Sequence, residues 1–149
     1  MEKSIKMPDM KTVVCITDQR KCDRIIRAGR AFADVTGTEL SIISVIRSNY
    51  QYDAESIEYL FSVSKENGAE MVLLYSDDVA KAIIRYIKDN RVANLMTGIP
   101  AKGDPVTGKI WSKFSHINFF VVEQDGGLRE VCNPVRAARA LTRLEPQNA

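Results

Sequence analysis

The stretch from Asn94 to Lys109 has the clearest potential for chemistry in this chain. Its sequence, NLMTGIPAKGDPVTGK, begins as an apolar run, breaks at Gly98 and Pro100, and continues through Gly103 and Gly108. A glycine-containing loop between a strand and a helix can turn its backbone N–H groups toward an anion. We therefore expect an anionic ligand to bind at this loop.

The octad GDPVTGKI, which starts at Gly103, nearly matches the phosphate-binding motif G-x-x-x-x-G-K-[ST]. The last position of that motif carries a hydroxyl group that binds Mg²⁺, and Ile110 occupies it here. Nucleotide hydrolysis is therefore not expected, although backbone amides and Lys109 would suffice to bind a phosphate. The alternative is that Gly103, Gly108 and the residues between them are ordinary turn formers.

Asp18 follows an apolar run directly, at a position where a carboxylate could meet a ligand. Its oxygens could accept hydrogen bonds from an adenine amino group or a ribose hydroxyl. They could equally cap the helix expected after it. Both interpretations remain open at the level of sequence.

The remaining polar residues give no catalytic constellation. His116 is the only histidine, so a Ser-His-Asp system at recognisable spacing and a histidine-based zinc site are not expected. We interpret Asp77 and Asp78 as charges at a helix N-terminus, with Ser76 or Asp77 as its cap, rather than as paired catalytic acids. We expect no enzyme activity and no metal requirement.

Three cysteines, Cys15, Cys22 and Cys132, show no C-x-x-C spacing. Cys15 lies in an apolar strand pattern, which predicts a buried, reduced thiol. Cys22 lies beside Arg20, Lys21 and Arg24, and such cations can make a thiol reactive, although an inert thiol is the simpler interpretation.

Composition narrows the class of protein. The 149 residues are 45% hydrophobic and 27% charged, which is typical of one globular domain. A net charge of +2 does not favour nucleic acid as a partner. No apolar run approaches the length of a membrane span, and the N-terminus shows no secretion signal. We expect a cytoplasmic protein without a membrane partner.

Hydrophobic periodicity predicts the elements that must position these residues. Short apolar strands are expected at 12–16, 40–46, 70–75, 93–97 and 117–122, with helices between them around 25–36, 57–66, 79–90 and 110–114. Such alternation is typical of a parallel sheet covered by helices on both faces. Ligands of these sheets bind beyond the carboxyl ends of the strands, where strand order reverses. If the first and fourth strands are neighbours, Asp18 and Gly98 lie on opposite lips of that crevice.

The chain is expected to divide into a flexible N-terminus (1–11), one domain (12–124) and a C-terminal extension (125–149). Gly126 and Gly127 mark a break, and Asn133 with Pro134 predicts the start of a short helix. That helix could pack on its own domain or on a second copy. It could also act as a basic arm for an acidic partner.

Several segments together resemble the universal stress proteins. They are VVCITDQRKCDRIIRAGRAFADVTGTEL, NGAEMVLLYSDDVAKAIIRYIKDNRVANLMTGIP and INFFVVEQD. The chain looks most similar to the universal-stress-protein-like domain of Kdp-type potassium-sensing histidine kinases. The resemblance implies a three-layer α/β fold with a five-stranded parallel sheet in the order 3-2-1-4-5 and helices on both faces. This fold is Rossmann-like and similar to that of the adenine nucleotide alpha hydrolases. The resemblance also implies a homodimer formed along the last strand, from Ile117 to Val122.

The nucleotide-binding branch of that family has the motif G-x-x-G-x9-G-[ST] after the fourth strand and an aspartate after the first. This chain has Asp18 and Gly98, but Ala101 replaces the second glycine, and Trp111 and Ser112 stand where Gly-[ST] would fall. The resemblance implies an adenine nucleotide, which could be ATP, AMP or a cyclic dinucleotide, held without a metal. The candidate binding residues are Thr17, Asp18, Val45, Gly98, Pro100, Gly103, Gly108 and Lys109.

Two functions remain in competition. The first is a regulatory or sensory module that binds an adenine nucleotide without catalysis. The second is a ligand-free homodimeric module that recognises a protein partner in a signalling pathway. The second predicts a closed crevice, with Ile99, Ile110 and Trp111 packed into it.

Overall fold

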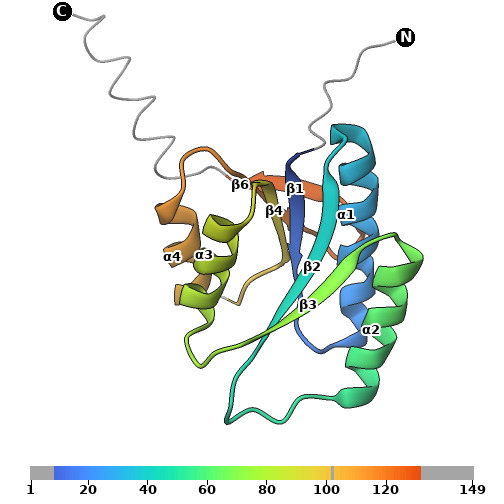
Figure 1. Ribbon diagram of the computed structural model, residues 1–149, viewed down its shortest axis with the longest axis vertical. Coiled ribbons are helices and arrows are strands. Elements are labelled where there is room, and N and C mark those ends of the chain that lie inside the picture. Colours follow the sequence, from blue (N-terminus) through green and yellow to red (C-terminus); the bar gives the residue numbers. More distant parts are fainter. Residues whose placement is uncertain (1–8, 102, 132–149) are drawn as a thin grey trace, which may run out of the picture.

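The computed structural model describes residues 9–101 and 103–131, which form one α/β body. Its centre is a six-stranded sheet in the order β3-β2-β1-β4-β5-β6, in which β5 and β6 are antiparallel and the other neighbours are parallel. Helices α1 and α2 cover one face, and α3 and α4 cover the other (Figure 1). The strands are β1 (Lys11–Cys15), β2 (Glu39–Ile46), β3 (Glu70–Tyr75), β4 (Val92–Gly98), β5 (Asn118–Val122) and β6 (Leu128–Val131). The helices are α1 (Asp23–Thr36), α2 (Ala54–Glu66), α3 (Val79–Asp89) and α4 (Pro105–Lys113), with a 3-10 turn at Arg20–Cys22.

The predicted fold class and the order of the first five strands are confirmed. Strand β6 is an addition that the sequence analysis missed, because its LREV sequence is short and has charged residues at two of its four positions. The predicted break at Gly126 and Gly127 is the turn of the β5–β6 hairpin, where Gly126 has φ 90° and Glu123 N–H donates to the Gly127 carbonyl at 2.8 Å. The helix expected at Asn133 lies outside the described residues, as does Cys132.

Strand β1 divides the core, since alternate side chains face opposite helical layers. Val14 faces α1 and α2 together with Met96, whereas Val13 faces α3 and α4 together with Leu95. All four side chains are at most 1% exposed. Both faces of the strand are therefore apolar, as a parallel sheet with helices on each side requires.

Side-chain caps start three of the helices. Asp53 caps α2 by accepting from Ser56 N–H, and Asp78 caps α3 by accepting from Lys81 N–H at 3.1 Å. The prediction of Ser76 or Asp77 as the α3 cap was therefore wrong by one or two residues. Asp77 instead accepts from the backbone N–H of Ser48 at 2.7 Å, which ties the β2–α2 loop to the end of β3.

The edge proposed for dimerisation is occupied in this chain. Strand β5 pairs with β4 on one side and with β6 on the other, from Phe119 to Val122. A second copy that adds to this side of the sheet would therefore meet β6. The homodimer itself stays a prediction.

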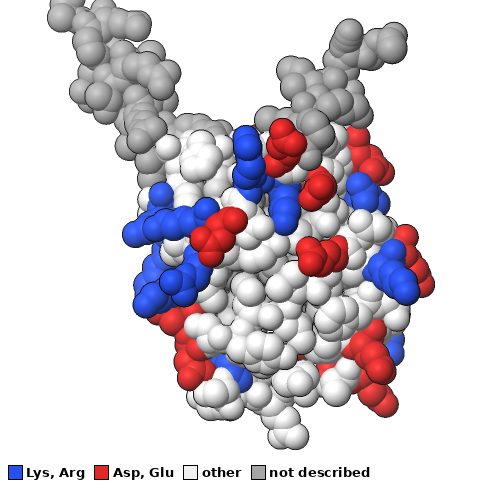
Figure 2. Space-filling view, viewed as in Figure 1, with Lys and Arg blue, Asp and Glu red and all other residues white. Residues whose placement is uncertain are grey.

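The surface is mixed in charge. On the face shown in Figure 2, acidic side chains lie among the basic ones, and a group of basic side chains lies over α3 and α4. Within the described ranges, each helix is too short or too polar to cross a bilayer.

Candidate functional site

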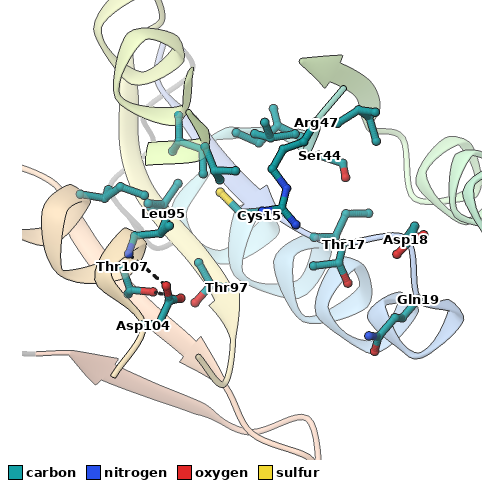
Figure 3. Close-up of a pocket in the computed structure, with 18 of the residues that line it drawn as sticks. Cys15, Thr17, Asp18, Gln19, Ser44, Arg47, Leu95, Thr97, Asp104 and Thr107 are labelled. Atoms are coloured by element: carbon teal, nitrogen blue, oxygen red, sulfur yellow. Dashed lines mark hydrogen bonds between the residues drawn. The ribbon is translucent and has the colours of Figure 1, made fainter. Parts of the chain in front are cut away.

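A cavity of about 350 Å³ opens at the carboxyl ends of β1, β2 and β4 (Figure 3). It lies at the crevice that the sequence predicted, beside the neighbouring strands β1 and β4. The polar residues that line it come from three strand ends and from the start of α4: Thr17, Asp18, Gln19, Ser44, Arg47, Tyr50, Thr97, Asp104 and Thr107.

Three of the eight predicted site residues line this cavity, namely Thr17, Asp18 and Val45. The five residues predicted after the fourth strand are not part of its lining: Gly98, Pro100, Gly103, Gly108 and Lys109. The lip on that side is formed instead by residues that the sequence analysis did not select, Thr97, Asp104 and Thr107.

The predicted phosphate cradle is mostly helix, so its interpretation as a loop was wrong. Helix α4 begins at Pro105, five residues before the predicted start at Ile110, and it includes Gly108 and Lys109. Both residues are exposed, and a Cβ added to Gly108 would meet nothing within 4 Å. Of the octad's two glycines only Gly103 has a left-handed backbone, with φ 76°. The alternative of ordinary turn formers is thus correct for the start of the octad.

Gly98 allows helix α1 to pack closely against the end of β4. It is the last residue of β4, and a Cβ added there would lie 3.0 Å from Cδ1 of Ile25 on α1. A side chain at this position would therefore press on the helix that covers the sheet.

The N-terminus of α4 is already capped by a carboxylate. Asp104 accepts hydrogen bonds from the N–H of Val106 and from the Oγ1 hydroxyl of Thr107, each at 3.0 Å. Figure 3 shows Asp104 and Thr107 together on one side of the cavity. A helix N-terminus normally attracts anions. Here the cap adds a negative charge at the place where a phosphate was expected.

Asp18 has a role that neither sequence interpretation foresaw. Its side chain is 8% exposed and accepts from Asp53 N–H at 2.7 Å and from the Tyr50 hydroxyl at 3.0 and 3.1 Å. It does not cap the next helical turn, which starts after Gln19 without a side-chain cap, so that interpretation was wrong. Asp18 instead connects the end of β1 to the β2–α2 loop (47–53). A contact between this carboxylate and an adenine ligand stays a prediction.

Arg47 is a further lining residue that sequence reasoning missed. It follows β2 directly, and its side chain points into the cavity in Figure 3. Its guanidinium carbon lies 5.7 Å from the centroid of the Tyr50 ring. Arg47 is the one cationic side chain among the described residues that line the cavity. Its position just after a parallel strand, like that of Asp18, was the signal that could have identified it.

The walls of the cavity are apolar. They are formed mainly by large aliphatic and aromatic side chains from the sheet, α3 and α4: Ile16, Ile43, Ile83, Leu95, Ile110 and Trp111. Trp111 also packs against Phe119, with ring centroids 6.2 Å apart. Ile99, by contrast, is 48% exposed and is not among the lining residues. The closed crevice expected of the ligand-free module is therefore not observed: Ile110 and Trp111 form a wall and leave the cavity open.

The two described cysteines and the histidine show no reactive arrangement. Cys15 is partly buried rather than fully buried as predicted, and desolvation raises the pKa of its thiol to about 12. Cys22 is 6% exposed, with its sulfur 3.5 Å from Oγ1 of Thr17, which agrees with an inert thiol. His116 is exposed and lies edge-on to Phe114, with ring centroids 6.0 Å apart. Within residues 9–101 and 103–131, no three His, Cys, Asp or Glu side chains form a group suited to a metal ion.

Comparison with known proteins relates the fold to one family. The sequence matches no protein-family model and no curated protein. Among solved structures, the universal stress protein from Archaeoglobus fulgidus superimposes with a TM-score of 0.56 at 18% identity, over 78% of this chain and 94% of that one. A structure of the universal stress protein from Archaeoglobus fulgidus in complex with dAMP gives a TM-score of 0.57 at 17% identity, over 78% of this chain and 98% of that one. The chain therefore has the fold of universal stress proteins.

Proposed function

We propose that this chain is a universal-stress-type regulatory module that binds an adenine nucleotide, without catalysis, in the cavity at the ends of β1, β2 and β4. The observation that carries the proposal is the open, apolar-walled cavity at the point where strand order reverses. A protein of the same fold has been solved with dAMP, which supports an adenine nucleotide as the ligand class.

The lining suits a nucleoside in chemical terms. The partly exposed apolar side chains of Val45, Val79 and Trp111 can cover the faces of a base, and burial of its apolar surface favours binding. Thr17 and Gln19 carry hydroxyl and amide groups at the rim, where they can exchange hydrogen bonds with base edges or a ribose.

Binding without turnover is proposed because the lining residues that the structure describes include no activated nucleophile. Desolvation raises the pKa of the Cys15 thiol to about 12 and so keeps it protonated, and a thiol attacks only as a thiolate. The proposal needs no metal, because Arg47 and the polar rim can meet the ligand directly.

Isothermal calorimetry with adenosine, AMP, ADP, ATP and cyclic di-adenylate tests this function. We expect at least one of them to bind, and we expect Val45→Trp to weaken it at least tenfold by filling the cavity. Val35→Trp is the matched control, since Val35 is 68% exposed on α1 and does not line the cavity. Circular dichroism would establish that both variants fold. If the unmodified protein gives no heat with any of the five ligands, the proposal fails.

We further propose that two copies associate at the β5–β6 edge of the sheet. Leu128, the first residue of β6, is 41% exposed, so this edge presents an apolar side chain to a partner. Sedimentation at several concentrations, for the native chain and for Leu128→Glu, tests the association. A native chain that stays monomeric at every concentration would refute it.

A further inference from the structure

Resting on the proposed function, we infer that the ligand is a nucleoside monophosphate whose phosphate binds Arg47, on the β2 side of the cavity. The loop after β4, which holds the glycines of the sequence motif, then does not bind the phosphate. The inference follows from where charge lies around the cavity.

The charged residues that line the cavity in the described part of the chain are Asp18, Arg47 and Asp104. Asp18 uses its carboxylate oxygens to accept from Tyr50 and Asp53. Asp104 sits at the N-terminus of α4, where its carboxylate accepts from the backbone N–H of Val106. A phosphate on the β4 side would meet a carboxylate, so its electrostatic energy is lowest on the Arg47 side.

Arg47 is available for a ligand. Among the described residues, the ion pairs within 4.0 Å are Arg27–Asp23, Arg30–Asp34 and Arg129–Glu123, and none involves Arg47. Hydrogen bonds from the backbone N–H and the Oγ hydroxyl of Ser48, and after them the charge of Arg47, lower the pKa of the nearby Asp77 carboxyl. Arg47 attracts this carboxylate but forms no ion pair with it within 4.0 Å, so its guanidinium N–H groups remain able to donate to a ligand. The guanidinium lies near the Tyr50 ring, which stabilises its position in the cavity without neutralising it.

The single guanidinium of Arg47 can bind one phosphate group. Its planar fork can donate two parallel hydrogen bonds to a single phosphate group. Further phosphates would extend either into solvent or toward Asp104. ATP should therefore bind no more tightly than AMP, whereas a glycine-rich phosphate loop would favour the triphosphate.

The test compares adenosine, AMP and ATP by calorimetry on four proteins. The unmodified protein should bind AMP about tenfold to a hundredfold more tightly than adenosine, the range expected for a charge-assisted hydrogen-bond pair. Arg47→Gln should remove that difference and leave adenosine affinity within about twofold. Lys109→Gln is the matched control, since it removes a cation from the predicted phosphate cradle, and it should change none of the three affinities.

Asp104→Asn tests the other side of the cavity. Asparagine is a good N-cap, so α4 should keep its start while the negative charge disappears. ATP affinity should then rise by about threefold to tenfold, and adenosine affinity should stay the same.

Three outcomes would overturn the inference and leave the proposed function intact: an unchanged AMP-to-adenosine ratio in Arg47→Gln, an equal loss of adenosine and AMP in that variant, or ATP binding far more tightly than AMP to the unmodified protein. If none of the three ligands binds the unmodified protein, the inference falls together with the proposed function.

Discussion

Alanine substitutions at two glycines inside helices should change the free energy of unfolding in opposite directions. Alanine normally stabilises a helix interior by about 1 kcal/mol over glycine, because glycine loses more backbone freedom on folding. At Gly108 on α4 the added Cβ meets nothing within 4 Å, so Gly108→Ala should show this full gain. At Gly29 on α1 the added Cβ would lie 2.6 Å from Cγ2 of Val14 and 3.1 Å from Cδ1 of Leu40.

At Gly29 the steric clash of the added Cβ makes the alanine substitution destabilising. Val14 is fully buried and Leu40 is 5% exposed, so neither can turn into free space. Overpacking of this kind costs about 1–3 kcal/mol, and the close approach to Val14 places Gly29→Ala in the upper half of that range. After the helix gain is subtracted, we expect a net loss of about 1–2 kcal/mol.

Urea denaturation and thermal melting of the two variants measure both effects. A change of 1 kcal/mol should move the melting temperature by about 2–4 °C in a chain of this size. Gly108→Ala should therefore melt a few degrees higher than the unmodified protein, and Gly29→Ala lower. Because the exchange is the same in both variants, each serves as the control for the other.

The packing argument is refuted if Gly29→Ala is as stable as Gly108→Ala. A second readout tests the corrected role of Gly108. If Gly108 belonged to a phosphate cradle, the alanine would abolish nucleotide binding, whereas a helix-interior residue outside the cavity should leave binding unchanged.

Two further predictions concern the cavity. Asp18→Ala should lower the free energy of unfolding, measured in urea, by about 2–3 kcal/mol, because the N–H of Asp53 loses a charged acceptor. Asp34→Ala, which removes an exposed carboxylate on α1, is the control. An equal effect in both variants would contradict the role given to Asp18. The raised pKa of Cys15, about 12 against 9.0, means that the folded state holds its proton where the unfolded state has lost it. The contribution of this thiol to the free energy of unfolding is thus fully present below pH 9 and falls as the pH rises from 9 to 12. In Cys15→Ala the free energy of unfolding should therefore decline less steeply over this pH range than in the unmodified protein. Parallel plots of unfolding free energy against pH for the two proteins would refute the burial argument.

Much of the fold could be predicted because its signal is local. The β-branched runs and the helical spacing between them identify the first five strands and their covering helices, and the preference for right-handed crossovers restricts the topology. The start of the third helix could not be placed to the residue from sequence, since Ser76, Asp77 and Asp78 can all act as N-caps. The contact of Asp77 with Ser48, which is 29 residues away, decides among them in favour of Asp78.

The octad GDPVTGKI shows why a motif needs its structural context. Asp104 followed by Pro105 is a favourable start for a helix, and it is also a favourable turn, so the letters alone permit a loop or a helix. Only the packing of α4 against α3 and the sheet, through Ile110, selects the helix. That selection moves Gly108 and Lys109 away from the cavity and puts the Asp104 carboxylate at its lip.

The sequence by itself determined the class of fold and the end of the sheet where a ligand can bind, because both follow from periodicities of a few residues. The tertiary structure decided which groups face that ligand. Asp18 meets Tyr50 and Asp53 across 32 and 35 residues, and Arg47 turns into a cavity whose opposite lip comes from α4. Such partners depend on the three-dimensional register of strands and loops, and spacing along one chain does not encode it.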